Sequence, residues 1–120
     1  MASHFITLAE AKTLTSNFKK SKEKLLHTDF KGKDVLPVCE TFSRDAFDVI
    51  LKKPGCTGLR IYFAMDDANM VKLVIVGVND KNEDMLTPMG ADGKDGDPGD
   101  IIENGIRCPT VCPPLSDLNG

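Results

Sequence analysis

Two neighbouring apolar segments in the middle of the chain most restrict its possible folds. Residues 59–65 alternate between apolar and other side chains, whereas residues 70–78 are apolar almost throughout. Alternation indicates a strand with one solvated face, and a continuous apolar run indicates a strand that is covered on both faces. The residues between them, 66–69, read Asp-Asp-Ala-Asn and are typical of a turn. We therefore predict a β-hairpin whose second strand is the central strand of an antiparallel sheet.

Capping signals predict two helices before this hairpin. Thr7 and Glu10 have the spacing of a capping box, and apolar residues follow at helical intervals, which predicts a helix over about residues 8–26. Ser43 is suited to cap a second, short helix with an apolar face. The sequence Pro54-Gly55 ends that helix, because proline cannot continue it and glycine favours its terminus.

Shorter segments complete the predicted fold. Residues 35–39 predict an edge strand, and brief strands are expected near residues 84–86 and 101–106. The fold class is therefore α+β, with an antiparallel sheet of three or four strands and both helices packed on one of its faces. We expect a core domain over residues 1–87. Residues 88–120 then form a glycine- and aspartate-rich loop and an irregular cysteine-proline tail that docks on the core.

Length and charge exclude several classes of protein. The 120 residues suit one domain, and no apolar run approaches the roughly 18 residues that span a bilayer. The net charge is −3, although residues 1–60 carry 11 Lys/Arg against 7 Asp/Glu. An acidic chain without tryptophan disfavours nucleic-acid binding. The N-terminus has no secretory pattern, so we expect a cytoplasmic protein with reduced thiols.

The cysteines are the most chemically suggestive residues. Cys108 and Cys112 are each followed by proline, and their spacing falls within that of zinc-binding cysteine pairs. Cys39 and Cys56 are isolated, and Cys39 lies in an apolar segment where a thiol is commonly buried. Three interpretations stay open: a zinc site completed by other ligands, a disulfide or redox pair between the tail cysteines, and buried thiols with a docked tail.

One polar group is a candidate ligand site. Glu40 ends the predicted edge strand, while Arg60 and Tyr62 share one face of the first hairpin strand. An arginine and a tyrosine beside a carboxylate could bind an anionic or planar ligand. The alternative is a structural ion pair on the sheet surface. No phosphate loop, dinucleotide fingerprint or nucleophile motif is present, so we predict no catalytic residues.

The acidic residues near the end of the chain have two interpretations. Residues 90–99 place glycine at every third position, and four aspartates lie in or beside this segment: Asp92, Asp95, Asp97 and Asp100. Clustered carboxylates could bind calcium, but the spacing does not match an EF-hand. Three triplets are too few for a collagen helix. We therefore expect a solvated loop.

Three sequence segments carry a resemblance to known proteins. These are Pro54-Gly-Cys-Thr-Gly-Leu-Arg-Ile-Tyr-Phe63, Val74-Ile-Val-Gly-Val-Asn79 and the Cys-Pro-x-x-Cys-Pro tail. Together they resemble a group of small uncharacterised proteins from Bacteroidetes, over roughly residues 35–86 and the tail. The resemblance implies a bacterial protein in which the following residues form a recurring pattern: Cys56, Gly58, Arg60, Tyr62, Cys108 and Cys112. It also implies that Cys56 acts together with the tail cysteines.

These observations lead to two functional hypotheses. The first is a cytosolic, non-catalytic binding or assembly module that recognises an unidentified protein partner or another copy of itself, with no cofactor. The second is a thiol-dependent protein that binds zinc or responds to redox state through Cys56, Cys108 and Cys112. An enzyme that uses Glu40, Arg60 and Tyr62 ranks third.

Overall fold

The computed structural model describes residues 4–86 and 99–120. The chain divides into two compact units. One unit contains Met1–Cys39 and Arg107–Gly120, and the other contains Glu40–Ile106. The predicted domain boundary between residues 87 and 88 lies outside the described residues, as does most of the glycine- and aspartate-rich segment.

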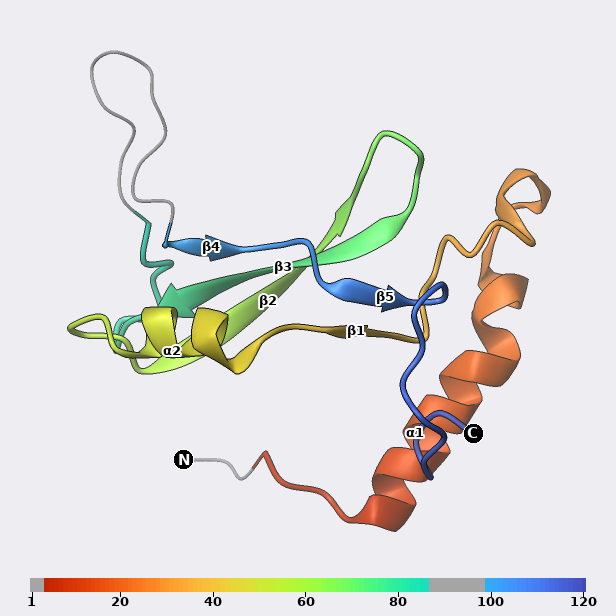
Figure 1. Ribbon diagram of the computed structural model, residues 1–120, viewed down its shortest axis with the longest axis horizontal. Helices are drawn as coiled ribbons and strands as arrows, with labels where there is room; N and C mark the ends of the chain where they lie inside the picture. The colour runs from red at the N-terminus through yellow and green to blue at the C-terminus, as the bar shows by residue number, and fades with distance from the viewer. Residues whose placement is uncertain (1–3, 87–98) are drawn as a thin grey trace. The chain divides into compact units, whose positions relative to one another are not determined.

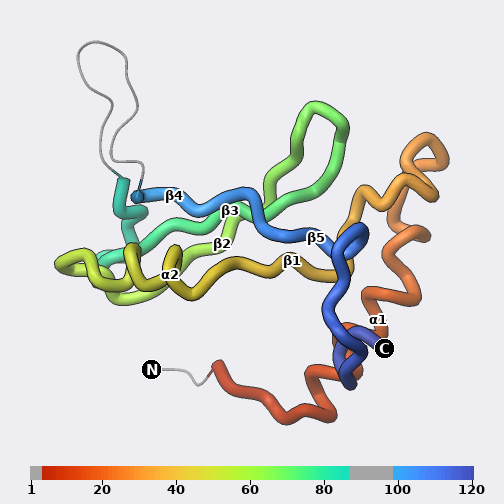
Figure 2. Tube along the Cα trace, viewed as in Figure 1, coloured from red at the N-terminus to blue at the C-terminus, as the bar shows by residue number. Residues whose placement is uncertain are grey.

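The unit formed by Glu40–Ile106 is built on the predicted hairpin. Strand β2 spans Gly58–Met65 and pairs antiparallel with β3, which spans Val71–Val78. The two-residue strand β4, Ile101–Ile102, pairs antiparallel with the other edge of β3 (Figures 1 and 2). The order of this sheet is therefore β2-β3-β4, and β3 is its central strand as predicted.

The hairpin register assigns its side chains to two faces. Ile61 lies opposite Ile75, and Tyr62 lies opposite Val74. Because successive residues of a strand point to opposite faces, one face carries four large apolar residues of β2. These are Leu59, Ile61, Phe63 and Met65. Arg60 and Tyr62 lie on the other face.

Helix α2, Arg44–Leu51, provides the core of this unit. The Ser43 hydroxyl accepts a hydrogen bond from the Ala46 N–H at 3.4 Å, which confirms the predicted cap. Ile50 is only 1% exposed and packs with Ile75 and Ile102 at the centre of the core. Burial of these aliphatic side chains fixes α2 on the sheet, because each fully buried side chain contributes about 1.5–3 kcal/mol.

Gly77 allows α2 to approach β3 closely. A Cβ atom at this position would lie 2.8 Å from Cγ2 of Ile50 and 3.1 Å from Sγ of Cys56. The first distance is shorter than carbon atoms tolerate, so only glycine fits without movement of the helix. The absence of a side chain at Gly77 therefore sets the spacing between the helix and the sheet.

The unit formed by Met1–Cys39 and Arg107–Gly120 begins with α1, Leu8–Ser21. The Thr7 hydroxyl accepts a hydrogen bond from the Glu10 N–H at 3.1 Å, as the capping signal predicted. The predicted helix over residues 8–26 is shorter as an α-helix, because the chain tightens into a 3₁₀ segment, η1, at Lys22–Leu25. A second 3₁₀ turn, η2, follows at Thr28–Phe30.

Two short strands make the second sheet. β1, Cys39–Thr41, pairs with β5, Ile106–Cys108. The predicted strand at residues 35–39 is displaced toward the C-terminus, because Pro37 cannot donate to a strand ladder. Val35 is nevertheless buried at 3% exposure. With two α-helices and antiparallel sheets, the fold class is α+β, as predicted.

The predicted strand at residues 84–86 is present only as an isolated β-bridge. Asp84 forms an isolated antiparallel bridge with Val78, and the N–H of Met85 donates to the Gly77 carbonyl at 2.9 Å. The loop after β3 therefore returns along the end of the hairpin, where it places Asp84 beside β2.

Candidate functional site

Arg60 and Tyr62 meet a carboxylate, and that carboxylate belongs to Asp84. The guanidinium of Arg60 donates to Oδ1 of Asp84, and the hydroxyl of Tyr62 donates to Oδ2 of the same residue. Arg60 also donates to the carbonyl of Asn82 at 3.2 Å and to the Oδ1 atom of that residue. The side chains thus join the polar face of β2 to the loop that follows β3.

The three ionisable groups of this cluster stabilise each other's charge states. The pKa of the Asp84 carboxyl is lowered from 3.8, first because Tyr62 donates a hydrogen bond to it and then because Arg60 does. The same hydrogen bond raises the pKa of the Tyr62 hydroxyl. The pKa of Arg60 is raised, chiefly by its hydrogen bond to Asp84. At neutral pH the cluster therefore contains one anion, one cation and one neutral phenol.

This geometry limits what the cluster can bind. Both oxygens of Asp84 accept hydrogen bonds from β2, and Arg60 is held by Asp84 and Asn82. An external carboxylate or phosphate would therefore have to displace Asp84 before it could bind Arg60 through two parallel hydrogen bonds. In its observed state the cluster matches the structural interpretation that the sequence left open.

Glu40 lies elsewhere in the same unit, on β1. Its carboxylate packs against Gly105, where an added Cβ atom would lie 2.7 Å from the Oε2 atom of Glu40 and 2.6 Å from the Cζ atom of Phe42. The carboxylate that Arg60 and Tyr62 contact is that of Asp84. No local sequence pattern indicates the bridge to Val78 that places Asp84 beside Tyr62.

An open hollow lies next to this cluster, at one end of the hairpin. It has a volume of about 410 Å³ and is lined by residues that include Pro54, Thr57, Asp80 and Lys81. Arg60 and Tyr62 do not line it. The hollow therefore gives no support to a catalytic site that uses those two residues.

The opposite face of β2 is apolar and largely uncovered. Ile61 is 52% exposed, Phe63 is 83% exposed and Met65 is 59% exposed. We call these three residues the β2 stripe. Helix α2 packs around Ile50, close to Gly77 and Leu59, and so covers the beginning of this face. The sequence predicted helices packed on one face of the sheet, but alternation along a strand does not indicate how much of that face a helix covers.

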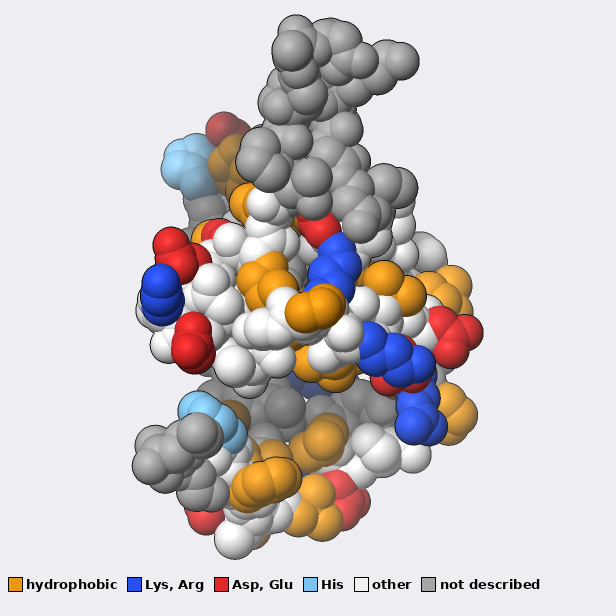
Figure 3. Space-filling model, turned by 90° about the vertical axis from the view of Figure 1, so that its left-hand side faces the viewer, with side chains coloured by type: hydrophobic (Ala, Val, Ile, Leu, Met, Phe, Trp, Pro, Cys, Tyr) orange, Lys and Arg blue, Asp and Glu red, His pale blue; other side chains and the backbone are white. Residues whose placement is uncertain are grey.

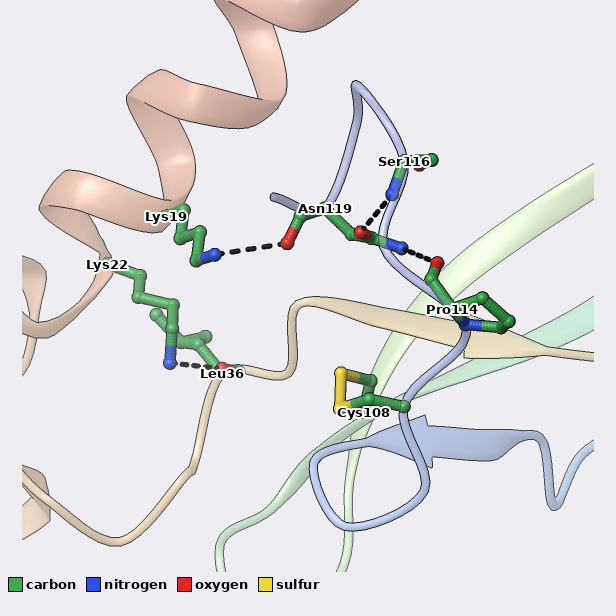
Figure 4. Close-up of a disulfide and its surroundings, with 8 residues drawn as sticks. Lys19, Lys22, Leu36, Cys108, Pro114, Ser116 and Asn119 are labelled. Atoms are coloured by element: carbon green, nitrogen blue, oxygen red, sulfur yellow. Dashed lines mark hydrogen bonds between the residues drawn. A yellow bond between two sulfur atoms is a disulfide. The ribbon is translucent and has the colours of Figure 1, made fainter.

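The two tail cysteines form a disulfide, which was one of the three open interpretations. Cys108 and Cys112 are bonded, and their Cα atoms are 4.5 Å apart (Figure 4). Cys108 is 6% exposed, whereas Cys112 is exposed. The disulfide closes a short loop after β5, in which Cys108 is the buried residue and Cys112 the exposed one.

Hydrogen bonds attach the tail to the N-terminal segment of its own unit. The ammonium group of Lys19 donates to the Asn119 carbonyl at 3.1 Å (Figure 4). The Val38 N–H donates to the carbonyl of Cys108 at 2.8 Å. The Arg107 guanidinium donates to two further backbone carbonyls at 3.1 and 3.2 Å, those of Asp34 and Val35. The tail is therefore docked on residues 19–38 of this unit.

Cys56 lies in the other unit, where it belongs to the surroundings of the core. Its thiol contacts the Gly58 carbonyl at 3.3 Å, and it packs against the cluster around Ile50. Among residues 4–86 and 99–120, no group of three or more His, Cys, Asp or Glu side chains is placed to hold a metal ion. The disulfide occupies the sulfurs of Cys108 and Cys112, so the zinc alternative requires the reduced protein.

Asp100 is the part of the acidic segment for which the structure gives a position. It is 6% exposed and pairs with the ammonium group of Lys53 after the end of α2. A buried carboxylate with a cationic partner serves to hold the chain, whereas the sequence predicted a solvated residue. The other three aspartates of the segment lie outside the described residues.

Among the described residues, hydrophobic, basic and acidic side chains are interspersed on the face drawn in Figure 3. In the described part of the chain, no helix is both long and apolar enough to cross a membrane. Comparisons of the chain with protein-family models, with curated proteins and with solved structures find no match.

Proposed function

We propose that this protein is a non-catalytic binding or assembly module that contacts another protein through the β2 stripe. The observation that supports this function is the 83% exposure of Phe63, between Ile61 and Met65 on one face of one strand. Exposed apolar residues are unremarkable when they are scattered, but neighbouring ones indicate a contact surface. Aromatic residues and methionine are enriched in protein interfaces.

The surroundings of the β2 stripe suit such a contact. The charged pair at the tip of the hairpin lies on the other face, because Lys72 is paired with Ala64, and its ammonium group is 3.7 Å from the carboxylate of Asp66. Depletion of charged residues is usual at the centre of a protein interface. The polar cluster of Arg60, Tyr62 and Asp84 is on the other face, where its internal bonds keep the strand and loop in place.

A photo-crosslinking amino acid at position 63 tests this proposal. In cells that produce the chain, we expect a crosslinked species when the probe replaces Phe63. The matched control places the probe at Leu115, which is 85% exposed and lies in the tail. Equal or absent crosslinking at the two positions would contradict a contact surface on β2.

A redox-responsive protein is the second candidate, and the Cys108–Cys112 disulfide favours it. In the cytosol, the location that we propose from the sequence, glutathione and thioredoxin keep thiols reduced. A disulfide there would form and open with the redox state, and the reduced thiols could also bind zinc. The double variant Cys108→Ser/Cys112→Ser tests this candidate. If its stability, zinc content and response to oxidant equal those of the wild type, this second function is excluded.

A further inference from the structure

We propose that the partner of the β2 stripe is a second copy of this chain, which pairs antiparallel with the outer edge of β2. This inference rests on the proposed binding function and specifies its partner. The two sheets would join across a two-fold axis, so that β2 of each copy becomes an interior strand.

The backbone of β2 has one edge without a strand partner. In the described part of the chain, β2 pairs with β3 alone and is the outer strand of the sheet. The Asp66 N–H donates to the Met70 carbonyl at 3.1 Å. Hydrogen-bonded and non-hydrogen-bonded pairs alternate along an antiparallel ladder. Because Asp66 belongs to a hydrogen-bonded pair, the even-numbered residues of β2 form backbone hydrogen bonds with β3. The odd-numbered residues of β2 direct their backbone N–H and C=O groups to the outer edge.

This edge lacks the features by which proteins prevent such pairing. Native edge strands are commonly short, or carry proline, a bulge or several charges. β2 has eight residues, no proline and a single charged residue, Arg60. Arg60 lies on the opposite face from the β2 stripe, and Asp84 of its own chain neutralises its charge. Two copies can therefore approach without an uncompensated like charge on either strand.

The side-chain pattern of β2 is complementary to itself. With Ile61 on the two-fold axis, Ile61 lies opposite Ile61 of the second copy and Phe63 lies opposite Leu59 of the second copy. In the same alignment, Arg60 lies opposite Tyr62 of the second copy, which places a cation beside an aromatic ring. The apolar residues of both strands then share one face.

Self-pairing by a two-fold axis requires that one surface fit itself. The pattern of β2 meets this requirement because every second residue from Leu59 to Met65 is apolar. The combined surface would unite two β2 stripes on one continuous six-stranded sheet. Pairing also satisfies the outward backbone groups of both strands, which a contact through side chains alone leaves to water.

Molecular mass measured by analytical ultracentrifugation tests this inference, with the full chain at several concentrations. We expect the wild type to form a dimer that dissociates on dilution. Phe63→Lys places a charge in the joined apolar face and should weaken the dimer by about tenfold or more. Ile61→Pro removes an outward N–H and should have a similar effect. Leu115→Lys is the matched control and should leave the dimer unchanged.

Each remaining outcome has a defined meaning. A wild type that stays monomeric, or a dimer that tolerates both β2 variants, overturns the inference. If position 63 crosslinks to a different protein while the purified chain is monomeric, the binding function stands and the second copy is excluded. If position 63 gives no crosslink and the chain is monomeric, both proposals fail. Should Ile61→Pro not fold, Phe63→Lys decides, because the side chain of Phe63 is already in solvent.

Discussion

At the scale of single residues, the loop after β3 is held by side chains rather than by a continued strand. Asn82 has a φ of 64°, in the left-handed region that asparagine and glycine tolerate best. Its side chain also accepts a hydrogen bond from Arg60. The residue therefore fixes the turn by its backbone and the strand contact by its side chain.

Substitutions at Asn82 separate these two contributions. Asn82→Gly keeps the backbone conformation and loses only the side-chain acceptor, so we expect a small loss of stability. Asn82→Ala loses the side-chain acceptor and also places a residue that disfavours the left-handed conformation at this position. We expect that conformation to cost about 1–2 kcal/mol more in the free energy of unfolding. Urea unfolding of the two variants measures the difference. Equal losses would show that the backbone conformation makes no separate contribution.

The polar cluster should give the protein a specific pH dependence. The lowered pKa of Asp84 means that its contribution to stability is complete at pH values above the ordinary carboxyl pKa of 3.8. The contribution is lost as the pH falls through the lowered value. We therefore expect Asp84→Asn to melt below the wild type at pH 7, with the two melting temperatures converging in acid.

The exposed residue Asp67 supplies the control for this experiment. Asp67→Asn makes the same chemical change in the turn between β2 and β3, at the other end of the hairpin, and it should follow the wild-type melting curve both at pH 7 and in acid. A constant difference between Asp84→Asn and the wild type across the pH range would contradict the assigned role of the carboxylate.

At the scale of elements, the contact between α2 and β3 depends on the missing side chain of Gly77. We expect Gly77→Ala to destabilise the fold by about 1–3 kcal/mol, because the new methyl group meets Ile50. Gly58→Ala is the control, since its Cβ would lie at an ordinary 3.5 Å from Val78. Its effect should stay within about 1 kcal/mol. Urea unfolding measures the free energy of unfolding of both variants, provided that its dependence on urea concentration is unchanged. Similar losses for Gly77→Ala and Gly58→Ala would contradict the close packing of α2 on β3.

The elements also show what the sequence can predict. The hairpin and both helix starts follow from local patterns: alternation at residues 59–65, a continuous apolar run at residues 70–78, and the caps Thr7 and Ser43. The short strands β1 and β5 are set by pairing between distant segments, and β1 was accordingly misplaced. Asp84 was missed for the same reason, because its bridge to Val78 is a tertiary contact.

At the scale of the whole molecule, the disulfide belongs to one of the two units. It closes a loop with a sequence separation of 4, and such a short loop stabilises by roughly 2 kcal/mol in the chain-entropy view. We expect Cys112→Ser to lower the hydrogen-exchange protection of the Val38 N–H, which donates to Cys108. The N–H groups of β3 should keep their protection, because they belong to the other unit.

Reduction of the wild type provides a second form of this experiment. A reducing agent should reproduce the exchange pattern of Cys112→Ser, since both break the same bond. Loss of protection in β3 under either condition would show that the two units unfold together rather than as separate cooperative blocks.

The close packing around Gly105 has a consequence for how this sequence can change over evolutionary time. Phe42 and Glu40 occupy the space that any side chain at position 105 would need. A larger residue there needs the space of both side chains, so a smaller residue must first appear at position 42 and the Glu40 carboxylate must move, and the order of the substitutions matters. Positions 42 and 105 should consequently vary as a pair among descendants of this chain, with glycine at position 105 wherever phenylalanine persists at position 42.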